Sequence, residues 1–543
     1  MRRLFLVLLA LAIPVFFLFL GANSVWDTNE AFYVETPRQM VRSGDYINPS
    51  FNHQPRFNKP VLSYWIVAGL YRAFGDSVAV ERAGIAVGAV AIVFAAFLIG
   101  RAIRSTLAGL IAALAVATAP RVVWFARKIV IDVYLTTFVS LGLAAFVLAQ
   151  RQPKRRRLFL VLMYIALGLG VLTKGPVAIA LPGLACLIWL TLERRLADIR
   201  HLMLPAGAAI VLAIVLPWYS AVYLQHGWAY ITSFVLEENL QRYATTAMTP
   251  AGRDVTFYLP VLVGELFPWG PMVVAPLVGI AAAWKRAASL ERLLWVWIAT
   301  FVVVFSFSQT KEDLYILPVI PAVAALVASA LVDSFASSPA RLLGTMVVVV
   351  CALCVAAAPA LYWMFGPSAG YYALPEIREF VIVLALTGVA SLALWLRARR
   401  VHAVAALALG FIALNYLFTG WVLPGVERSK PIPPLVRTIN ARAAPNAKLG
   451  YFRMGLQSFV YYADRGPVEE IGVLEQAKAF FYDDRDSWAL MGQGEWEEVR
   501  ALVPHVCVAD RHPLSIFDAR LADIIQRRPP EDVLLVRNHC DKR

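Results

Sequence analysis

The sequence predicts an all-α polytopic membrane protein, with about 13 transmembrane helices, that ends in a small extracytoplasmic α/β domain. This fold class rests on composition, on the length of the apolar segments and on the distribution of charge. Hydrophobic residues make up 60% and charged residues 16% of the 543 residues, and the mean hydropathy is +0.65. Soluble domains carry about a quarter charged residues, so the composition argues against a soluble enzyme, a disordered protein and a coiled coil.

Thirteen apolar segments are candidates for membrane spans, since a helix needs about 20 residues to cross roughly 30 Å of hydrocarbon. The first follows Arg2 and Arg3, as in a signal peptide, but it lacks a clean small-residue cleavage site, so we interpret it as an anchor. The segments lie near 4–22, 82–100, 105–123, 132–150, 158–173, 175–192, 203–224, 266–284, 290–308, 314–333, 342–364, 377–396 and 401–421.

The charges between these segments are distributed unevenly. Loops on the N-terminal side carry 19 Lys and Arg but 4 Asp and Glu, and the whole chain has a net charge of +14. The positive-inside rule therefore predicts a cytoplasmic N-terminus, and thirteen spans then place residues 422–543 outside the cytoplasm. Because the positive excess lies in membrane loops, it argues against a nucleic-acid partner.

Two domains are predicted. Residues 1–421 form the membrane domain, whose first outer loop spans 23–60, and residues 422–543 form the soluble α/β domain, with Lys430–Pro434 as the linker. Residue patterns in the second domain predict strands and helices. The expected strands are Ala447–Phe452, Val506–Ala509 and Asp532–Arg537, and the expected helices lie near Gln457–Ala463, Glu475–Tyr482 and Glu495–Leu502.

Cysteine and histidine spacing does not indicate a metal site. The five Cys form no CxxC…CxxC pattern, and no HxxxH pattern occurs, although structural and catalytic zinc sites commonly use such spacings. Only Cys507 and Cys540 lie outside apolar segments. They could pair if their domain lies in an oxidising compartment.

The first outer loop carries the candidate catalytic acids. Asp27 and Glu30 are three residues apart and would share one face of a helix. In a water-lined cavity they could act as a general base, or they could cap free backbone N–H groups at a helix start. Lys59, which precedes Pro60, could bind phosphate or extend towards the membrane interface.

Further candidates lie at the outer ends of later segments. Arg127 and Asp132 could bind substrate, or Asp132 could form a simple ion pair at the interface with the two cations beside it, Arg127 and Lys128. Lys174 occupies a glycine-containing turn that lacks Walker spacing and a preceding strand, so we reject a nucleotide site there. Lys174 could still reach an anion.

Two more outer segments complete the candidate set. Glu238 and Arg242 are spaced i, i+4 and could form a surface pair, whereas Lys311 and Tyr315 bring a cation and a phenol to the same side. Arg binds phosphate oxygens bidentately and Lys adds a point charge. The expected convergence of Lys59, Arg242 and Lys311 on one membrane surface therefore predicts a site for a lipid phosphate or pyrophosphate.

The alternatives to an enzyme are a lipid or sugar transporter, such as a flippase, and a polytopic binding protein. Transporters usually place ionisable residues or broken helices near the bilayer midplane. Here the spans are mostly free of charge, no internal repeat relates two halves, and charged residues concentrate in outer loops. A binding protein would not need an acid and cations on one face. We therefore favour an enzyme.

Eight motifs on the predicted outer side or at span ends occur in the order of a known family. They are Asn29-Glu30-Ala31-Phe32-Tyr33-Val34-Glu35, Arg56-Phe57-Asn58-Lys59-Pro60, Asp132, Leu172-Thr173-Lys174-Gly175-Pro176, Pro217-Trp218-Tyr219, Glu238-Asn239-Leu240-Gln241-Arg242-Tyr243, Pro268-Trp269 and Lys311 with Tyr315-Ile316-Leu317-Pro318. With these motifs most of the chain resembles the GT-C glycosyltransferases, specifically the bacterial lipid A aminoarabinose transferase and protein O-mannosyltransferase group.

The resemblance implies an enzyme of the bacterial inner membrane with a periplasmic C-terminal domain. Such an enzyme transfers a sugar, with inversion, from a polyprenyl-phosphate-linked donor to a lipid A, protein or glycan acceptor. The family's base is a first-loop acid, often the Asp of an Asp-Glu pair, which reads Asn29-Glu30 here. An amide does not accept a proton at neutral pH, so Asp27 or Glu30 must take this role.

The resemblance also implies how the lipid phosphate is bound. The family's lysine, arginine and tyrosine around this phosphate correspond to Lys59, Arg242 and Tyr315. The family's metal positions read Asn58 and Glu237, without His, which argues against zinc. No cofactor is expected to be required, and the use of a divalent cation is left open.

Overall fold

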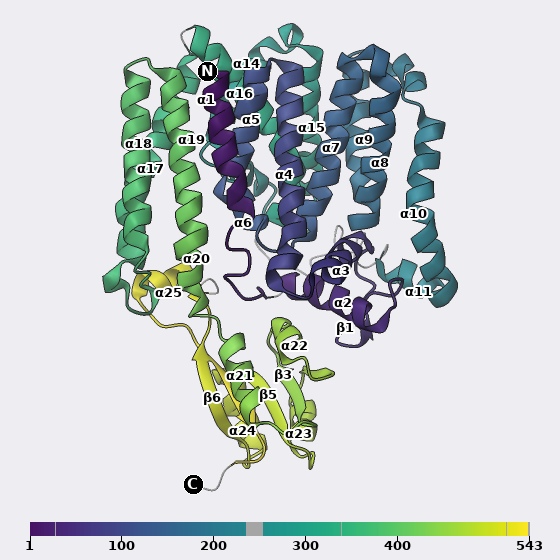
Figure 1. Cartoon of the computed structure of the whole chain (residues 1–543), viewed down its shortest axis with the longest axis vertical. Helices are drawn as coiled ribbons and strands as arrows, with labels where there is room; N and C mark the ends of the chain where they lie inside the picture. The colour runs from purple at the N-terminus through teal and green to yellow at the C-terminus, as the bar shows by residue number, and fades with distance from the viewer. Residues whose placement is uncertain (28, 235–252, 338, 517–518, 541–543) are drawn as a thin grey trace.

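The computed structural model describes residues 1–543 apart from 28, 235–252, 338, 517–518 and 541–543. A bundle of helices forms the larger part, and a five-stranded sheet lies beyond the end of the bundle opposite the N-terminus (Figure 1). The first-loop helices α2 (Asn29–Ser43) and α3 (Leu62–Phe74) lie at that same end. A mostly helical bundle with a small C-terminal sheet domain, as predicted, is thereby confirmed.

Nine helical stretches in the described ranges are long and apolar enough to cross a membrane, which confirms a multi-pass membrane protein. They contain α4 (Val78–Ile103), α7 (Ile131–Arg151), α8 (Arg156–Lys174), α10 (Leu204–His226), α15 (Ser289–Ser306), α16 (Ile320–Ala336), α17 (Arg341–Phe365), α18 (Ile377–Leu396) and α19 (Arg400–Leu417).

The count of thirteen spans is not confirmed. Three other apolar helices, Thr106–Thr118 (α5), Val177–Leu192 (α9) and Gly270–Ile280, are shorter. A helix of 13 residues, such as α5, extends only about 20 Å at 1.5 Å per residue. The N-terminal α1 (Arg2–Ala12) gives way to a 3-10 helix, η1 (Ile13–Phe16), which contains Pro14.

Small residues allow α4 and α5 to pack closely. Every residue of α5 from Ala108 to its end is buried. A Cβ added to Gly109 would lie 2.6 Å from the backbone carbonyl oxygen of Phe97, a residue of α4. Small residues at such crossings let the backbones of membrane helices approach each other. This crossing places α5 inside the bundle.

Replacing Gly109 by Ala is expected to lower the free energy of unfolding by about 1–3 kcal/mol, because the added methyl group must displace backbone atoms. Thermal unfolding in detergent measures the effect. Gly183→Ala in α9 is the control, since a Cβ there meets nothing within 4 Å. Equal unfolding temperatures for the two variants would contradict the close crossing.

The C-terminal sheet has the strand order β4-β3-β5-β7-β6. Strand β3 pairs in parallel with β4 and β5, whereas β7 pairs antiparallel with β5 and β6. A disulfide joins Cys507 to Cys540, so the pairing left open by the sequence is present. The strands are β3 (Lys448–Phe452), β4 (Val468–Ile471), β5 (Ser487–Gly492), β6 (Cys507–Pro513) and β7 (Asp532–Arg537).

The three strands and three helices expected in this domain are present, the helices as α22 (Ser458–Ala463), α23 (Leu474–Phe481) and α24 (Gln493–Leu502). Strands β4 and β5 were not predicted. All of β5 is buried, so it lacks the alternation that marks a half-exposed strand. The expected linker Lys430–Pro434 is partly wrong, because α21 (Ile432–Arg442) begins within it. Proline fits the first turn of a helix.

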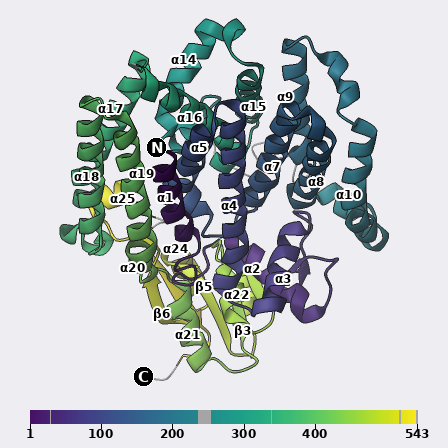
Figure 2. The ribbon, with the colours of Figure 1, turned by 45° about the horizontal axis from the view of Figure 1, so that its top comes forward.

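The sheet domain contacts the first loop of the membrane domain. Helices α2 and α22 pack against each other, and they lie close together in both Figure 1 and Figure 2. Arg38 of α2 donates a hydrogen bond of 2.9 Å to the carbonyl oxygen of Tyr461. Arg42 forms an ion pair of 2.5 Å with Asp464. The C-terminal domain is thus held against the loop that carries the candidate acids.

Candidate functional site

Three side chains that are far apart in the sequence meet where α7 begins and α8 ends. The ammonium group of Lys174 forms an ion pair with the carboxylate of Asp132 and lies 4.7 Å from the centre of the Tyr315 ring. The Lys174 and Asp132 side chains are 16% and 10% exposed. We call Asp132, Lys174 and Tyr315 the Lys174 cluster. All three were predicted as substrate-binding residues.

Helix ends position this cluster. Asp132 lies in the first turn of α7, and Lys174 is the last residue of α8, so each charge complements the dipole of its helix. Gly175 follows Lys174 with a φ of +94°, a conformation that glycine adopts readily. Tyr315 lies in the 3-10 helix η7 (Asp313–Val319), and its ring centre is 5.0 Å from that of Phe305.

A second ionic group includes the start of η7. Arg121 of α6 (Pro120–Phe125) forms ion pairs with Asp313 and, at 2.7 Å, with Glu265. Sequence reasoning missed this group. The available signal was Arg121 itself, because it lies inside the expected span 105–123 and an ionisable residue in such a segment usually marks function.

Arg127 and Lys128 have different surroundings. The Arg127 guanidinium donates a hydrogen bond of 2.9 Å to the carbonyl oxygen of Val15 in η1, and burial lowers the pKa of Arg127 to about 10. The Lys128 ammonium lies 4.9 Å from the centre of the Trp124 ring. Burial lowers the pKa of Lys128 as well, and the nearby charge of Glu30 opposes this shift. Arg127 therefore binds the backbone, whereas Lys128 lies over an aromatic ring.

The expected convergence of Lys59, Arg242 and Lys311 stays a prediction. Arg242 and its partner Glu238 lie outside the described residues. Lys59 is half-buried. The ammonium group of Lys311 is buried and donates a hydrogen bond of 2.6 Å to the carbonyl oxygen of Ser308. The Lys311 side chain is therefore hydrogen-bonded to the backbone of the same loop, three residues before it.

Glu30 is fully enclosed, with 1% of its surface exposed. Oε1 accepts hydrogen bonds from Arg82 Nε at 2.9 Å and from the Ile129 backbone N–H at 3.1 Å. Oε2 accepts from Arg82 Nη2 at 2.8 Å and from the Trp26 backbone N–H at 2.8 Å. Burial raises the pKa of Glu30, but the charge and hydrogen bonds of Arg82 outweigh it and hold this pKa below its ordinary value. Four donors thus occupy the acceptor positions of this one carboxylate.

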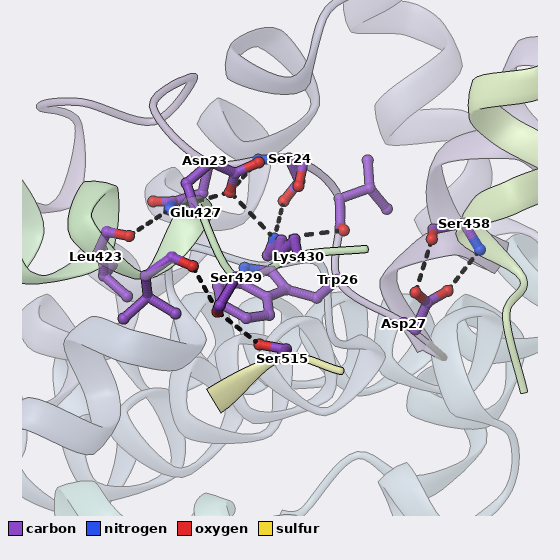
Figure 3. A network of polar contacts seen from close by, with 12 residues as sticks. Asn23, Ser24, Trp26, Asp27, Leu423, Glu427, Ser429, Lys430, Ser458 and Ser515 are labelled. Atoms are coloured by element: carbon purple, nitrogen blue, oxygen red, sulfur yellow. Dashed lines mark hydrogen bonds and ion pairs between the residues drawn. The ribbon is translucent and has the colours of Figure 1, made fainter. Parts of the chain in front are cut away.

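Asp27 is exposed and lies at the junction with the C-terminal domain. Its carboxylate accepts hydrogen bonds from the Ser458 backbone N–H at 2.6 Å and from the Ser458 hydroxyl at 2.7 Å (Figure 3). A cavity of about 450 Å³ opens here between the first loop and the C-terminal domain. Its polar lining includes Asp27, Lys430, Arg453, Glu495, Glu531 and Asp532. Asp27 thus has the access to a cavity that Glu30 lacks.

Lys430 contacts the first loop a few residues before Asp27, next to Ser24 and Trp26 (Figure 3). Its ammonium group donates a hydrogen bond of 2.6 Å to the carbonyl oxygen of Ser24 and lies 3.5 Å from the centre of the Trp26 ring. Burial lowers the pKa of Lys430 to about 8, even though the nearby Glu427 favours the charged form. The segment around Asp27 is therefore bound by Ser458 and Lys430 of the C-terminal part.

No group of three or more His, Cys, Asp or Glu residues is placed to hold a metal ion in the described ranges. The acids above are instead paired with Arg or Lys, or they accept hydrogen bonds from backbone and hydroxyl groups. These residues place carboxylates, which can accept a proton, and ammonium groups, which can bind an anion, at one end of the helix bundle.

Sequence comparison relates the chain to membrane transferases. Residues 4–231 match the sequence model of the dolichyl-phosphate-mannose-protein mannosyltransferase family. The undecaprenyl phosphate-alpha-4-amino-4-deoxy-L-arabinose arabinosyl transferase 1 of Pseudomonas fluorescens is 31% identical over 352 residues. This alignment covers 63% of the present chain and 62% of the relative, so the chain matches less than two thirds of that protein's length.

Solved structures share the fold. ArnT from Cupriavidus metallidurans, crystallised with undecaprenyl phosphate, superposes with a TM-score of 0.79 at 22% identity and covers 99% of this chain and 98% of that one. The archaeal oligosaccharyltransferase AglB from Archaeoglobus fulgidus, in complex with an inhibitory peptide and a dolichol-phosphate, gives a TM-score of 0.52 at 13% identity, over 96% and 74% of the two chains. The chain therefore has the GT-C membrane fold and is related in sequence to the bacterial aminoarabinose transferases, as its eight motifs predicted.

Proposed function

We propose that the protein transfers a sugar from a polyprenyl-phosphate-linked donor to a lipid A, protein or glycan acceptor, with inversion. The observation that carries this proposal is the Lys174 cluster, which brings a cation, a carboxylate and a phenol to one end of a GT-C bundle. The names of the related proteins support a polyprenyl phosphate as the lipid. Nothing in the comparisons favours a transporter.

The reaction needs a base and a stabilised leaving group. The acceptor oxygen attacks the anomeric carbon and loses its proton to a carboxylate, while the bond from that carbon to the lipid phosphate breaks. The phosphate leaves with the bonding electrons, and cations placed beforehand stabilise its charge. We assign that task to Lys174 with Tyr315, and to Lys59 and Arg242 on the family resemblance.

Of the two first-loop acids, we assign the role of base to Asp27. Asp27 is exposed into a cavity, whereas the lone pairs of Glu30 are occupied by four donors. A base must lie within reach of the acceptor hydroxyl. A polar acceptor entering between the first loop and the C-terminal domain would meet Asp27 first.

Asp27→Asn is expected to reduce transfer by roughly 100-fold or more, the usual contribution of a positioned base, with an unchanged unfolding temperature. Glu30→Gln is expected to lower stability instead, because it removes the charge that pairs with the buried Arg82. Purified variants are assayed with labelled polyprenyl-phosphate sugar in EDTA, since we propose that no metal is required. Transfer by Asp27→Asn at the unmodified rate would refute this assignment.

We further propose that the N-terminus lies in the cytoplasm and the C-terminal domain in the periplasm of a bacterial inner membrane. The positive loops support this orientation. The Cys507–Cys540 disulfide also supports it, because such bonds persist in oxidising compartments. Labelling of the reduced thiols of spheroplasts by an impermeant maleimide checks it, and labelling only after lysis would refute it.

A further inference from the structure

A groove lies between α4, α7 and α8 at the end of the bundle where α4 and α7 finish. Its volume is about 860 Å³. The three helices are neighbours in Figures 1 and 2, and α7 packs against both others. The walls are largely apolar and include Phe94, Leu98, Phe138, Leu141, Phe159 and Leu162. Because Lys174 terminates the opposite end of α8, this groove is separate from the Lys174 cluster.

Four arginines line the same groove. Arg101 and Arg104 come from the end of α4, Arg151 from the end of α7, and Arg155 from η2 (Pro153–Arg155). Arg104 forms an ion pair with Asp333. The other three are exposed, and no carboxylate in the described part of the chain forms an ion pair with any of them. The groove therefore combines apolar walls with three guanidinium groups that pair with no carboxylate among the described residues.

This combination matches an amphiphile with a negative headgroup. Guanidinium groups bind phosphate oxygens through two parallel hydrogen bonds, and basic pockets between membrane helices favour anionic lipid headgroups. Phe94 and Leu162 of the walls are 53% and 46% exposed. In a bilayer these surfaces contact acyl chains.

We propose that this groove binds an anionic glycerophospholipid of the surrounding bilayer. Its phosphate lies at Arg101, Arg151 and Arg155, and an acyl chain lies along the apolar walls. Charge complementarity selects an anionic lipid over a zwitterionic one, since the trimethylammonium group of phosphatidylcholine would lie among guanidinium groups. The proposal does not depend on the transferase reaction, because it concerns the other end of the bundle.

Native mass spectrometry of the full chain in detergent tests this site with phosphatidylglycerol and phosphatidylcholine of identical acyl chains. Each cationic residue near a membrane surface favours an anionic lipid by about fivefold. We therefore expect the unmodified chain to retain phosphatidylglycerol at least roughly tenfold more tightly. The triple variant Arg101→Gln/Arg151→Gln/Arg155→Gln is expected to lose this preference.

The matched control is Arg194→Gln/Arg397→Gln/Arg399→Gln. It removes the same charge from exposed residues at the same end of the bundle, outside the groove, and should keep the preference. Equal retention of the two lipids by the unmodified chain would overturn the proposal, and this comparison decides the matter even if the groove variant fails to fold. Equal losses in both triple variants, or displacement of phosphatidylglycerol by an equal amount of undecaprenyl phosphate, would also overturn it.

Discussion

Replacing Lys174 by Met is expected to reduce sugar transfer by roughly 100-fold or more. The loss of one preorganised group that stabilises developing negative charge commonly costs this much in kcat. In the proposed reaction, the lipid phosphate gains charge as its bond to the sugar breaks, and the Lys174 ammonium lies beside the Tyr315 ring at that site. Steady-state rates with labelled polyprenyl-phosphate sugar measure the effect.

A second variant separates catalysis from folding. Lys174→Met alone leaves the carboxylate of Asp132, a buried residue, without its cation, which is destabilising in itself. Lys174→Met/Asp132→Asn removes both charges, so it should recover the unfolding temperature while transfer stays low. If the double variant regained transfer, Lys174 would be structural only. Lys478→Met, at an exposed lysine of α23, is expected to behave like the unmodified chain.

Replacing Arg82 by Met is expected to lower the free energy of unfolding by about 3–5 kcal/mol, the usual cost of removing one partner from a buried ion pair. Arg82 and Glu30 are 2% and 1% exposed, so water cannot replace the lost contact. Arg82 also donates hydrogen bonds to the carbonyl oxygens of Leu20, Asn23 and Ser24. Denaturation in mixed detergent measures the change.

The control for this variant is Arg72→Met, an exposed arginine of α3, which should leave the unfolding free energy within about 0.5 kcal/mol of the original. Arg82→Met/Glu30→Met should recover part of the loss, because no buried charge then remains. It should not recover all of it, since the N–H groups of Trp26 and Ile129 lose their acceptor. An Arg82→Met chain as stable as Arg72→Met would contradict the buried pair.

Several site residues were predictable from the sequence, but their partners were not. Asp132 was selected because it lies near cations at the outer end of a predicted span, and Lys174 because it lies in a turn from which it could reach an anion. Their ion pair joins positions 42 residues apart, which no local spacing predicts. Arg121 was not chosen as a site residue, because it lies inside the segment 105–123, which was interpreted as a membrane span.

For Glu30, too, the sequence did not reveal the partner residue. Spacing from Asp27 allowed either a base or a helix cap, and our proposal that Glu30 is structural rests on Arg82, which lies 52 residues further along the chain. Asp27 was open to the same two interpretations. Its hydrogen bonds come from Ser458, 431 residues away, so only the docking of the C-terminal domain revealed them.

Apolar length and composition were enough to predict a multi-pass membrane protein, and the residue patterns after position 421 predicted a C-terminal α/β domain. Membrane spans can be predicted from the sequence because the free-energy cost of burying polar groups in hydrocarbon applies to each segment by itself. The pairing of Lys174 with Asp132, the enclosure of Glu30 and the exposure of Asp27 came only from the packed chain. Each depends on contacts between segments that lie 42, 52 and 431 residues apart in the sequence, and only the packing of the whole chain brings such segments together.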